Sequence, residues 1–343
     1  MHLAGQTEAD LAAWATSRGA SAGAARVLAR ALLAGVAGRP VRESPAQHLF
    51  AEAQARFESA LPGAEMVEDA DGTLRFAVRL DDGNMVETVA IHQPASRLRA
   101  KERWTVCLSS QVGCARGCVF CETGRLGLLR NLDAAEIVVQ YALVARRLGF
   151  APRNVVFMGM GEPLDNLEAV LRAVAVLREP KGFAVPERRM TVSTVGIVPR
   201  MDELFARSRV NLAVSLHAIE EATRLALLPV ARRFSLADLR AAIARAPRTV
   251  LLQWTLIRGV NDADGDADAL ADFAHGLDVR VNLIPLNPGP DRRQVAPPLD
   301  RCRAFQSRLA GRGVRTLLRL PHGQSVGGAC GQLAGSLRAQ AQG

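Results

Sequence analysis

Short apolar runs and helical patterns alternate along the chain from Trp104 onward. Each of six apolar runs of strand length is followed by a segment whose apolar residues recur every three or four positions, the spacing of a helix with one buried face. The predicted strands are 104–110, 154–159, 189–194, 211–216, 249–257 and 279–285. The predicted helices are 133–148, 166–178, 199–207, 235–246, 265–275 and 298–310.

Six consecutive strand–helix units predict an α/β fold with a parallel sheet, because parallel strands are joined by crossover helices. A further apolar run, Val314 to Leu320, offers a closing strand. This periodicity is compatible both with an open, doubly wound sheet and with a curved partial barrel. In either arrangement the functional residues are expected at the carboxyl ends of the strands.

Two shorter regions precede these units. Residues from Thr7 to about Ala60 have a helical pattern, with a loop predicted between Gly35 and Glu43. Alternating residues between Asp71 and Ile91 flank the pair Asp82-Gly83, which predicts a β-hairpin. The domains we predict are a helical accessory domain at 1–65, a hairpin linker at 66–100, a catalytic domain at 101–322 and a tail at 323–343.

Composition indicates a reducing compartment. A chain of 343 residues can bury a large core, and its six cysteines, three of them within eight positions, do not resemble the disulfide framework of a secreted protein. The segment Met1–Asp10 lacks the basic start and apolar core of a signal peptide. No apolar run reaches the roughly 18 residues of a membrane helix. We expect a cytoplasmic monomer without membrane association.

The chain is strongly basic. Lysine and arginine number 43 against 34 acidic residues, which gives a net charge of +9. Such a balance is typical of a surface that binds a polyanion, although a composition rich in arginine and poor in lysine also follows from a GC-rich genome. Basic clusters lie at 97–103, 188–189, 232–233 and 292–293.

Three cysteines lie within one short segment. Cys114, Cys118 and Cys121 have the spacing C-x3-C-x2-C. With this spacing one loop can give three thiolates to three irons of a cubane cluster and leave the fourth iron without a protein ligand. An open metal position of this kind is where a substrate or cofactor binds. The same spacing is compatible with tetrahedral zinc that has a distant fourth ligand, and with a chance group of buried thiols.

Four further motifs each follow an apolar, strand-like run. They are Met158-Gly-Met-Gly-Glu-Pro163, Thr191-Val-Ser-Thr-Val-Gly196, Val214-Ser-Leu-His217 and Leu283-Ile-Pro-Leu-Asn287. With the cysteine segment, and in this order, they resemble the radical S-adenosylmethionine (SAM) superfamily. Within it, the segments 107–114, 130–132 and 328–333 resemble the ribosomal RNA adenine C-methyltransferases, a C2-adenine family and its C8-methylating relative.

This resemblance implies a partial (β/α)6 radical-SAM barrel that carries a [4Fe–4S] cluster and binds SAM. Residue by residue, it makes Cys114, Cys118 and Cys121 the cluster ligands, with Phe120 as a shield beside them. The positions implied to contact SAM are Gly161, Glu162, Ser193, Ser215, Leu216, His217 and Asn287. Among these, the carboxylate of Glu162 would pair with the amino group of SAM.

The resemblance also implies roles for two isolated cysteines. Cys330 would accept a methyl group from one SAM, and a radical from a second SAM would activate that methyl for addition to adenine, leaving a protein–RNA thioether. Cys107 would resolve the thioether by forming a disulfide with Cys330, which requires Cα atoms within about 7 Å. Glu87 is implied to be a proton acceptor, with an exposed hairpin residue as the alternative interpretation of its position. Cys302, on a predicted helix, is expected to be a buried structural thiol.

The chain departs from the family pattern at Gln324–Cys330 and at Ile219–Glu221, where the usual Asp-Ile and Pro-Asn-Asp residues are absent. The first functional hypothesis is C2-methylation of adenine in large-subunit ribosomal RNA, with transfer RNA as a second substrate. The alternatives are C8-methylation, radical modification of a peptide or small molecule, and a non-catalytic, cluster-bearing RNA-binding protein. The partners implied are RNA and an electron donor such as flavodoxin or ferredoxin.

Overall fold

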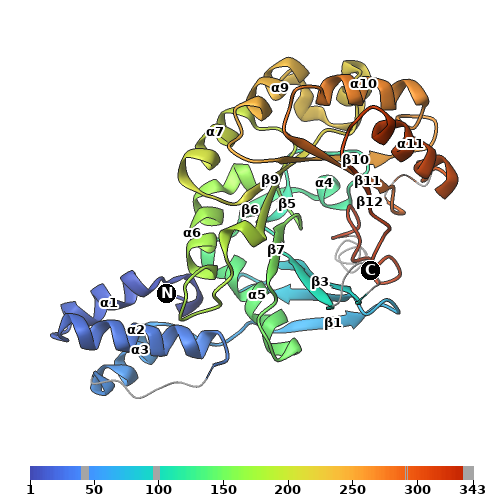
Figure 1. The fold of residues 1–343 in the computed structure, drawn as a ribbon. Coiled ribbons are helices and arrows are strands. Elements are labelled where there is room, and N and C mark those ends of the chain that lie inside the picture. Colours follow the sequence, from blue (N-terminus) through green and yellow to red (C-terminus); the bar gives the residue numbers. More distant parts are fainter. Residues whose placement is uncertain (40–45, 96–100, 290, 292, 335–343) are drawn as a thin grey trace.

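The computed structural model describes residues 1–39, 46–95, 101–289, 291 and 293–334. A single ten-stranded sheet organises the molecule, in the order β1-β2-β3-β4-β7-β8-β9-β10-β11-β12 (Figure 1). Its strands are β1 Ala64–Glu68, β2 Leu74–Arg79, β3 Met85–Gln93, β4 Arg103–Cys107, β7 Asn154–Phe157, β8 Met190–Thr194, β9 Asn211–Ser215, β10 Val250–Leu256, β11 Val279–Pro285 and β12 Thr316–Leu318.

From β4 to β12, every pair of neighbouring strands is parallel. The chain therefore returns between strands through helices, which form an arc outside the sheet (Figure 1). These helices are α5 Ala134–Leu148, α6 Leu167–Leu177, α7 Val198–Arg207, α9 Leu236–Ala244, α10 Asp264–Ala274 and α11 Leu299–Gly311. The predicted α/β class and partial barrel are confirmed. Among the described residues, β12 makes no pairing that would close the barrel.

Helix α5 shows how local sequence sets these elements. Asp133 accepts the backbone N–H of Glu136, whose side chain accepts that of Asp133 in return, so the first turn is capped from both sides. Gly149 ends the helix at φ 74°, a left-handed conformation that suits glycine. Between these ends the helix buries Ile137, Tyr141 and Val144 against the sheet.

The predicted hairpin is present and is continuous with the barrel. Strands β2 and β3 pair in an antiparallel manner, and β3 pairs in the same way with β4. Strand β1, which the sequence pattern did not predict, pairs with β2. The segment expected to be a linker therefore extends the barrel sheet by three strands.

Three helices precede the sheet, namely α1 Glu8–Ser17, α2 Ala22–Val36 and α3 Phe50–Arg56. They share a small hydrophobic core that is separate from that of the barrel. The carboxylate of Glu179, near the end of α6, accepts the backbone N–H of Glu8 at 3.1 Å, and Arg172 donates to the carbonyl of Gly5. The loop predicted between Gly35 and Glu43 lies partly outside the described residues.

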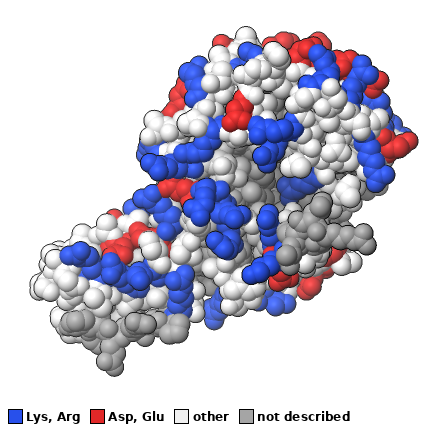
Figure 2. All heavy atoms as spheres, in the orientation of Figure 1, with Lys and Arg blue, Asp and Glu red and all other residues white. Residues whose placement is uncertain are grey.

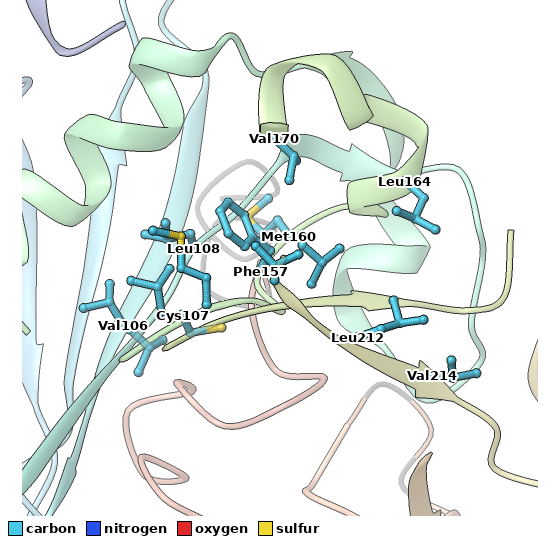
Figure 3. Packing of buried hydrophobic residues seen from close by; sticks show 14 of the residues in the cluster. Val106, Cys107, Leu108, Phe157, Met160, Leu164, Val170, Leu212 and Val214 are labelled. Carbon is cyan, nitrogen blue, oxygen red and sulfur yellow. The ribbon is translucent and has the colours of Figure 1, made fainter. Parts of the chain in front are cut away.

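The main core fills the space between the sheet and its outer helices (Figure 3). In β4 and just after it, Val106 and Leu108 are buried in this core together with Phe157 and Met160. Side chains alternate between the faces of a strand, so Cys107, between Val106 and Leu108, points to the inner side of the barrel.

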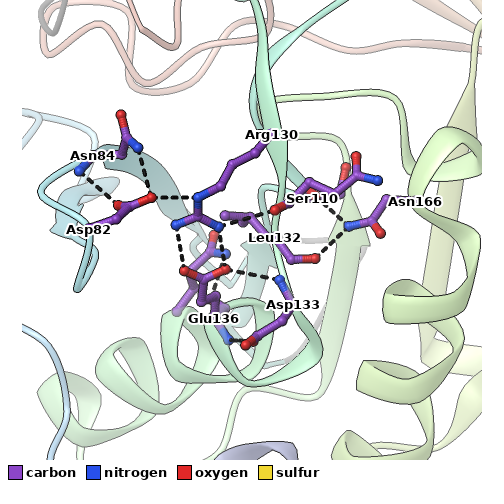
Figure 4. Close-up of polar contacts among 10 residues, drawn as sticks. Asp82, Asn84, Ser110, Arg130, Leu132, Asp133, Glu136 and Asn166 are labelled. Carbon is purple, nitrogen blue, oxygen red and sulfur yellow. Dashed lines mark hydrogen bonds and ion pairs between the residues drawn. The ribbon is translucent and has the colours of Figure 1, made fainter.

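A two-stranded hairpin surrounds the cysteine segment and was not predicted. It consists of β5 Gln111–Cys114 and β6 Gly127–Asn131, with the short helix α4 Glu122–Leu126 between them. Arg130 of β6 contacts Asp82 in the β2–β3 turn and Glu136 on α5, at 2.5 and 2.8 Å (Figure 4). These contacts fix the cysteine hairpin to the sheet. A second short helix, α8 Glu221–Leu227, was also not predicted from the sequence pattern.

Candidate active site

One pocket lies at the carboxyl ends of the parallel strands, as the order of motifs predicted. Most of the proposed site residues line it, namely Cys114, Cys118, Cys121, Gly161, Glu162, Ser193, Ser215, His217, Asn287 and Cys330. Phe120 also lines this pocket, where its ring meets the edge of the His217 ring at 4.9 Å between centroids. Leu216, by contrast, is fully buried behind the wall. The topology thus collects residues from five distant motifs around one space.

The cysteine loop forms one side of the pocket. Its backbone is tied to helix α8 by a hydrogen bond from the N–H of Val119 to the carbonyl of Leu227 at 3.1 Å. Burial raises the pKa of Cys114 to about 12 and also raises the pKa values of Cys118 and Cys121. A cationic metal centre is what would hold such thiols as thiolates.

Among the residues that the structure describes, no three histidine, cysteine or acidic side chains are arranged to hold a single metal ion. Cys114, Cys118 and Cys121 instead line one shared pocket, and all three are free thiols. This arrangement leaves room for a group larger than one ion.

The surroundings of a buried guanidinium beside the loop indicate that an anionic group fits in the pocket. Arg224 on α8 is 1% exposed. Its Nη2 donates to the carbonyl of Val195 at 3.1 Å, whereas its Nε and Nη1 have no hydrogen-bond partner. A buried cation with unused donors is costly unless an anion completes its environment. Arg224 interacts electrostatically with Cys118, so a thiolate-bound iron–sulfur cluster fits the residues present. The sequence carried no signal for Arg224, because arginine on a helix ordinarily faces solvent.

The glycine-rich segment after β7 places a carboxylate in the pocket wall. Gly161 has φ 102°, and a Cβ there would lie 2.6 Å from the Cβ of Gln111, so only glycine fits. The next residue, Glu162, is buried and accepts the backbone N–H groups of Leu164 and Val195 at 3.0 and 2.9 Å. Burial raises the pKa of Glu162 to about 7. A cationic ligand group, such as the amino group of SAM, would stabilise this carboxylate.

Several polar residues of the pocket were missed by the sequence reasoning, among them Gln253 and Thr255. Gln253 and Thr255 lie on β10 and line the wall. Their signal was present, because each interrupts an otherwise apolar run that should be buried on both faces of a parallel sheet.

The C-terminal segment folds back over the mouth of the barrel. The side chain of Asn287 donates to the carbonyl of Cys330 at 3.0 Å and accepts a hydrogen bond from Gln324 at 2.8 Å. The backbone N–H of Glu122 donates to the carbonyl of Gly331 at 2.8 Å. Asn287, proposed to contact SAM, therefore also positions the tail.

Cys107 and Cys330 line the same small pocket, which adjoins the larger one. Cys330 lines both pockets and is exposed, whereas Cys107 is buried. Burial, and then the neighbouring Cys330, raises the pKa of Cys107 to about 12. The hydroxyl of Thr88 donates to the carbonyl of Cys107 at 2.6 Å. Both cysteines are free thiols in this structure.

Glu87 is not an exposed hairpin residue, and that alternative is wrong. It is 0% exposed on β3 and forms an ion pair with Arg75. Cys302 is buried on α11, as expected.

The basic clusters are only partly described. Residues 97–100 and 292 lie outside the described parts of the chain, while Arg188, Arg232 and Arg233 are exposed. Figure 2 shows one face on which Lys and Arg side chains gather around a central hollow. In the described chain, no helix has the length and apolar character needed to cross a membrane.

Comparisons with known proteins agree with this geometry. Residues 108–271 match the model of the Radical SAM superfamily. The chain is 51% identical over 287 residues to a "Probable RNA methyltransferase" of Sorangium cellulosum, which covers 81% of this chain and 70% of that protein. It is 45% identical over 269 residues to a "Dual-specificity RNA methyltransferase RlmN" of Syntrophobacter fumaroxidans, with 77% of each covered.

The crystal structure of a radical SAM methyltransferase from Sphaerobacter thermophilus aligns with a TM-score of 0.88 at 38% identity, over 97% of this chain and 99% of that one. The family implies a [4Fe–4S] cluster and SAM as cofactors. The chain belongs to the radical SAM superfamily and, within it, to the RlmN-type RNA methyltransferases.

Proposed function

We propose that this enzyme methylates C2 of an adenine in structured RNA, with 23S ribosomal RNA as the first substrate and transfer RNA as a second. The observation that carries the proposal is the position of two isolated cysteines. Cys107 and Cys330 are 223 positions apart and line one pocket, and Cys330 also lines the pocket of the three clustered cysteines. A cluster-bearing RNA-binding protein without catalysis needs neither thiol.

In this proposal each residue has a defined task. Cys114, Cys118 and Cys121 hold the cluster, and Glu162 binds the amino group of SAM. When bound, the cluster and SAM supply the methyl group and the radical chemistry. The sulfur of Cys330 loses its proton and accepts the methyl group. The radical then removes one hydrogen atom from this methyl group, and its carbon bonds to the adenine carbon. The adduct gives up the proton of that adenine carbon and one electron, for which the bound cluster would be the acceptor, and leaves a thioether.

Cys107 releases the product. Its thiolate attacks the sulfur of Cys330, so that an S–S bond forms as the bond between that sulfur and the methyl carbon breaks. The released carbon takes up a proton, and a thiol reductant must return the disulfide to two thiols. The raised pKa of Cys107 indicates that it needs a base or a change of environment before it attacks.

Charge supports an RNA substrate. The net charge of +9 and the exposed arginines 188, 232 and 233 suit a phosphate backbone. We also propose a cytoplasmic location and an electron donor of the flavodoxin or ferredoxin type. The same surface would attract such acidic donors.

The test is mass spectrometry of nucleosides from 23S ribosomal RNA and from transfer RNA of cells that have or lack this gene. The expected result is that 2-methyladenosine disappears on deletion and returns with the parent gene, but not with a Cys330→Ser variant. A change in 8-methyladenosine instead would contradict the C2 assignment. Unchanged adenosine methylation in both RNA classes would contradict RNA as the substrate.

A further inference from the structure

The carboxylate of Glu87 is fully buried, yet Glu87 lines neither the cluster pocket nor the pocket shared by Cys107 and Cys330. We propose that Glu87, held by Arg75, is a positioning residue that anchors the segment 330–334 and thereby places the Cys330 thiol over the barrel mouth. This positioning role is separate from the proton-acceptor role that the family resemblance implies for Glu87. It rests on the proposed function only in that Cys330 is the methyl carrier.

The anchor is a direct contact with the backbone of the tail. Oε2 of Glu87 accepts the N–H of Ala334 at 2.6 Å, while Oε1 pairs with Nη1 of Arg75. Ala334 is 0% exposed and has φ 77°, a conformation that alanine rarely adopts. A residue persists in such a conformation only where surrounding contacts hold it, and the buried carboxylate is one such contact.

Strand β3 is a rigid base for this anchor. It lies between β2 and β4, and the carbonyl of Glu87 accepts the hydroxyl of Ser109 at 2.6 Å. The next residue, Thr88, donates to the carbonyl of Cys107. Adjacent residues of one strand therefore hold the Cys107 backbone and the Cys330 segment, which fixes the two thiols relative to each other.

The rest of the segment is held from the barrel side. Asn287 binds the carbonyl of Cys330, the N–H of Glu122 binds that of Gly331, and the hydroxyl of Thr123 binds that of Leu333 at 2.9 Å. The anchor at Ala334 adds a bond from the opposite, hairpin side. Bonds from two sides restrict a short segment far more than bonds from one side, because either set alone leaves a hinge.

Both oxygens of Glu87 have partners in this arrangement, and the side chain is fully buried. Glu87 lines neither the cluster pocket nor the pocket shared by Cys107 and Cys330, so the contacts that it makes here are structural. Loss of a charge-assisted hydrogen bond shifts an opening equilibrium by about 10- to 100-fold.

The test compares Glu87→Gln with Glu87→Ala in the reconstituted enzyme without RNA. Glutamine keeps an oxygen for the Ala334 N–H but is not basic, whereas alanine removes the anchor. Two rates are measured by mass analysis of the peptide that contains Cys330 and Ala334, namely transfer of labelled methyl from SAM and backbone hydrogen–deuterium exchange. For Glu87→Ala we expect about 10- to 100-fold slower methyl transfer and comparably faster exchange. For Glu87→Gln both rates should stay within about 3-fold of the parent.

The control is Asp81→Asn, an exposed change in the turn of the same hairpin. Glu87→Met also removes the acceptor but fills the buried space that alanine would leave empty, and it should reproduce Glu87→Ala, so the proposal is tested even where Glu87→Ala does not fold. Unchanged rates in both Glu87→Ala and Glu87→Met would overturn the proposal. A parent enzyme that never methylates Cys330 would overturn the proposed function instead, and the hydrogen-exchange rates would still test the anchor.

Discussion

The ring of His217 accepts a hydrogen bond from the backbone N–H of Thr255, with 2.9 Å between Nδ1 and the amide nitrogen. Since Nδ1 is the acceptor, the neutral ring carries its proton on Nε2. The carbonyl of His217 accepts the side-chain amide of Asn261 at 2.7 Å, which holds the residue at φ 60°. His217, which lines the pocket, therefore offers an N–H donor, and contacts from β10 and from the loop after it determine its orientation.

Replacement of His217 should make stability less dependent on pH. Burial, and then Arg224, lowers the pKa of His217 from 6.5 to about 3. Because the folded pKa lies below the unfolded one, the stability that this group contributes is present above pH 6.5 and is lost as pH falls toward 3. Thermal melting from pH 4 to 8 should show a smaller loss of stability for His217→Gln than for the parent. Equal slopes for the two proteins would contradict a buried neutral ring.

Glu162 lowers the stability of the protein at high pH, whereas His217 lowers it at low pH. Its folded pKa of about 7 lies above the usual 4.5, so the stability it contributes is present below pH 4.5 and is lost as pH rises through 7. The shift corresponds to about 3 kcal/mol. Glu162→Gln should therefore make the SAM-free protein more stable at pH 8 while weakening SAM binding about 10-fold or more. Denaturant unfolding and equilibrium dialysis measure the two effects, and tighter SAM binding would exclude the proposed contact.

Iron content distinguishes the cluster cysteines from the others. Anaerobic reconstitution of the parent should give about four irons and four sulfides per chain, with a brown chromophore. Cys118→Ala should lose the chromophore, whereas Cys302→Ala, a matched change at a buried cysteine on α11, should keep it. Stoichiometric zinc without a chromophore in the parent would contradict an iron–sulfur site.

The two isolated cysteines should fail at different steps. Cys330→Ser should lose methyl labelling and product but keep the cluster, because Cys114, Cys118 and Cys121 remain. Cys107→Ala should stop after the RNA bond has formed, since no thiol is left to resolve it. Protein purified from cells should then carry RNA, detectable by nuclease treatment and mass analysis. Normal turnover by Cys107→Ala would show that its assigned role is wrong.

Gly161 should tolerate no side chain. In Gly161→Ala the new Cβ would lie 2.6 Å from the Cβ of Gln111, at a φ of 102°. Backbone strain of this kind costs about 1–3 kcal/mol, and it would move Glu162 in the pocket wall. Gly265→Ala, in α10 with open space around it, should instead be neutral or stabilising by up to about 1 kcal/mol. Chemical denaturation compares the pair, and equal stabilities would refute the close approach.

Local sequence patterns were enough to predict the alternation of strands and helices after Trp104. Each predicted helix from α5 to α11 matches an observed one within a few residues, because amphipathic spacing is a property of neighbours along the chain. The elements that were not predicted, β1, β5, β6, α4 and α8, are short. A strand of four or five residues shows too little of its period to be recognised.

The residues of the candidate site also fall into two groups, those that the sequence motifs predicted and those that only the tertiary structure brought together. Motif order placed Glu162, His217 and Asn287 at strand ends, and the parallel topology brought them to one pocket. Tertiary structure alone decided that Glu87 is buried against Ala334 and that Arg224 lies beside the cysteine loop. Burial and partners depend on residues far away in the sequence, here 247 positions for Glu87 and Ala334. Such contacts arise only when the whole sheet has formed.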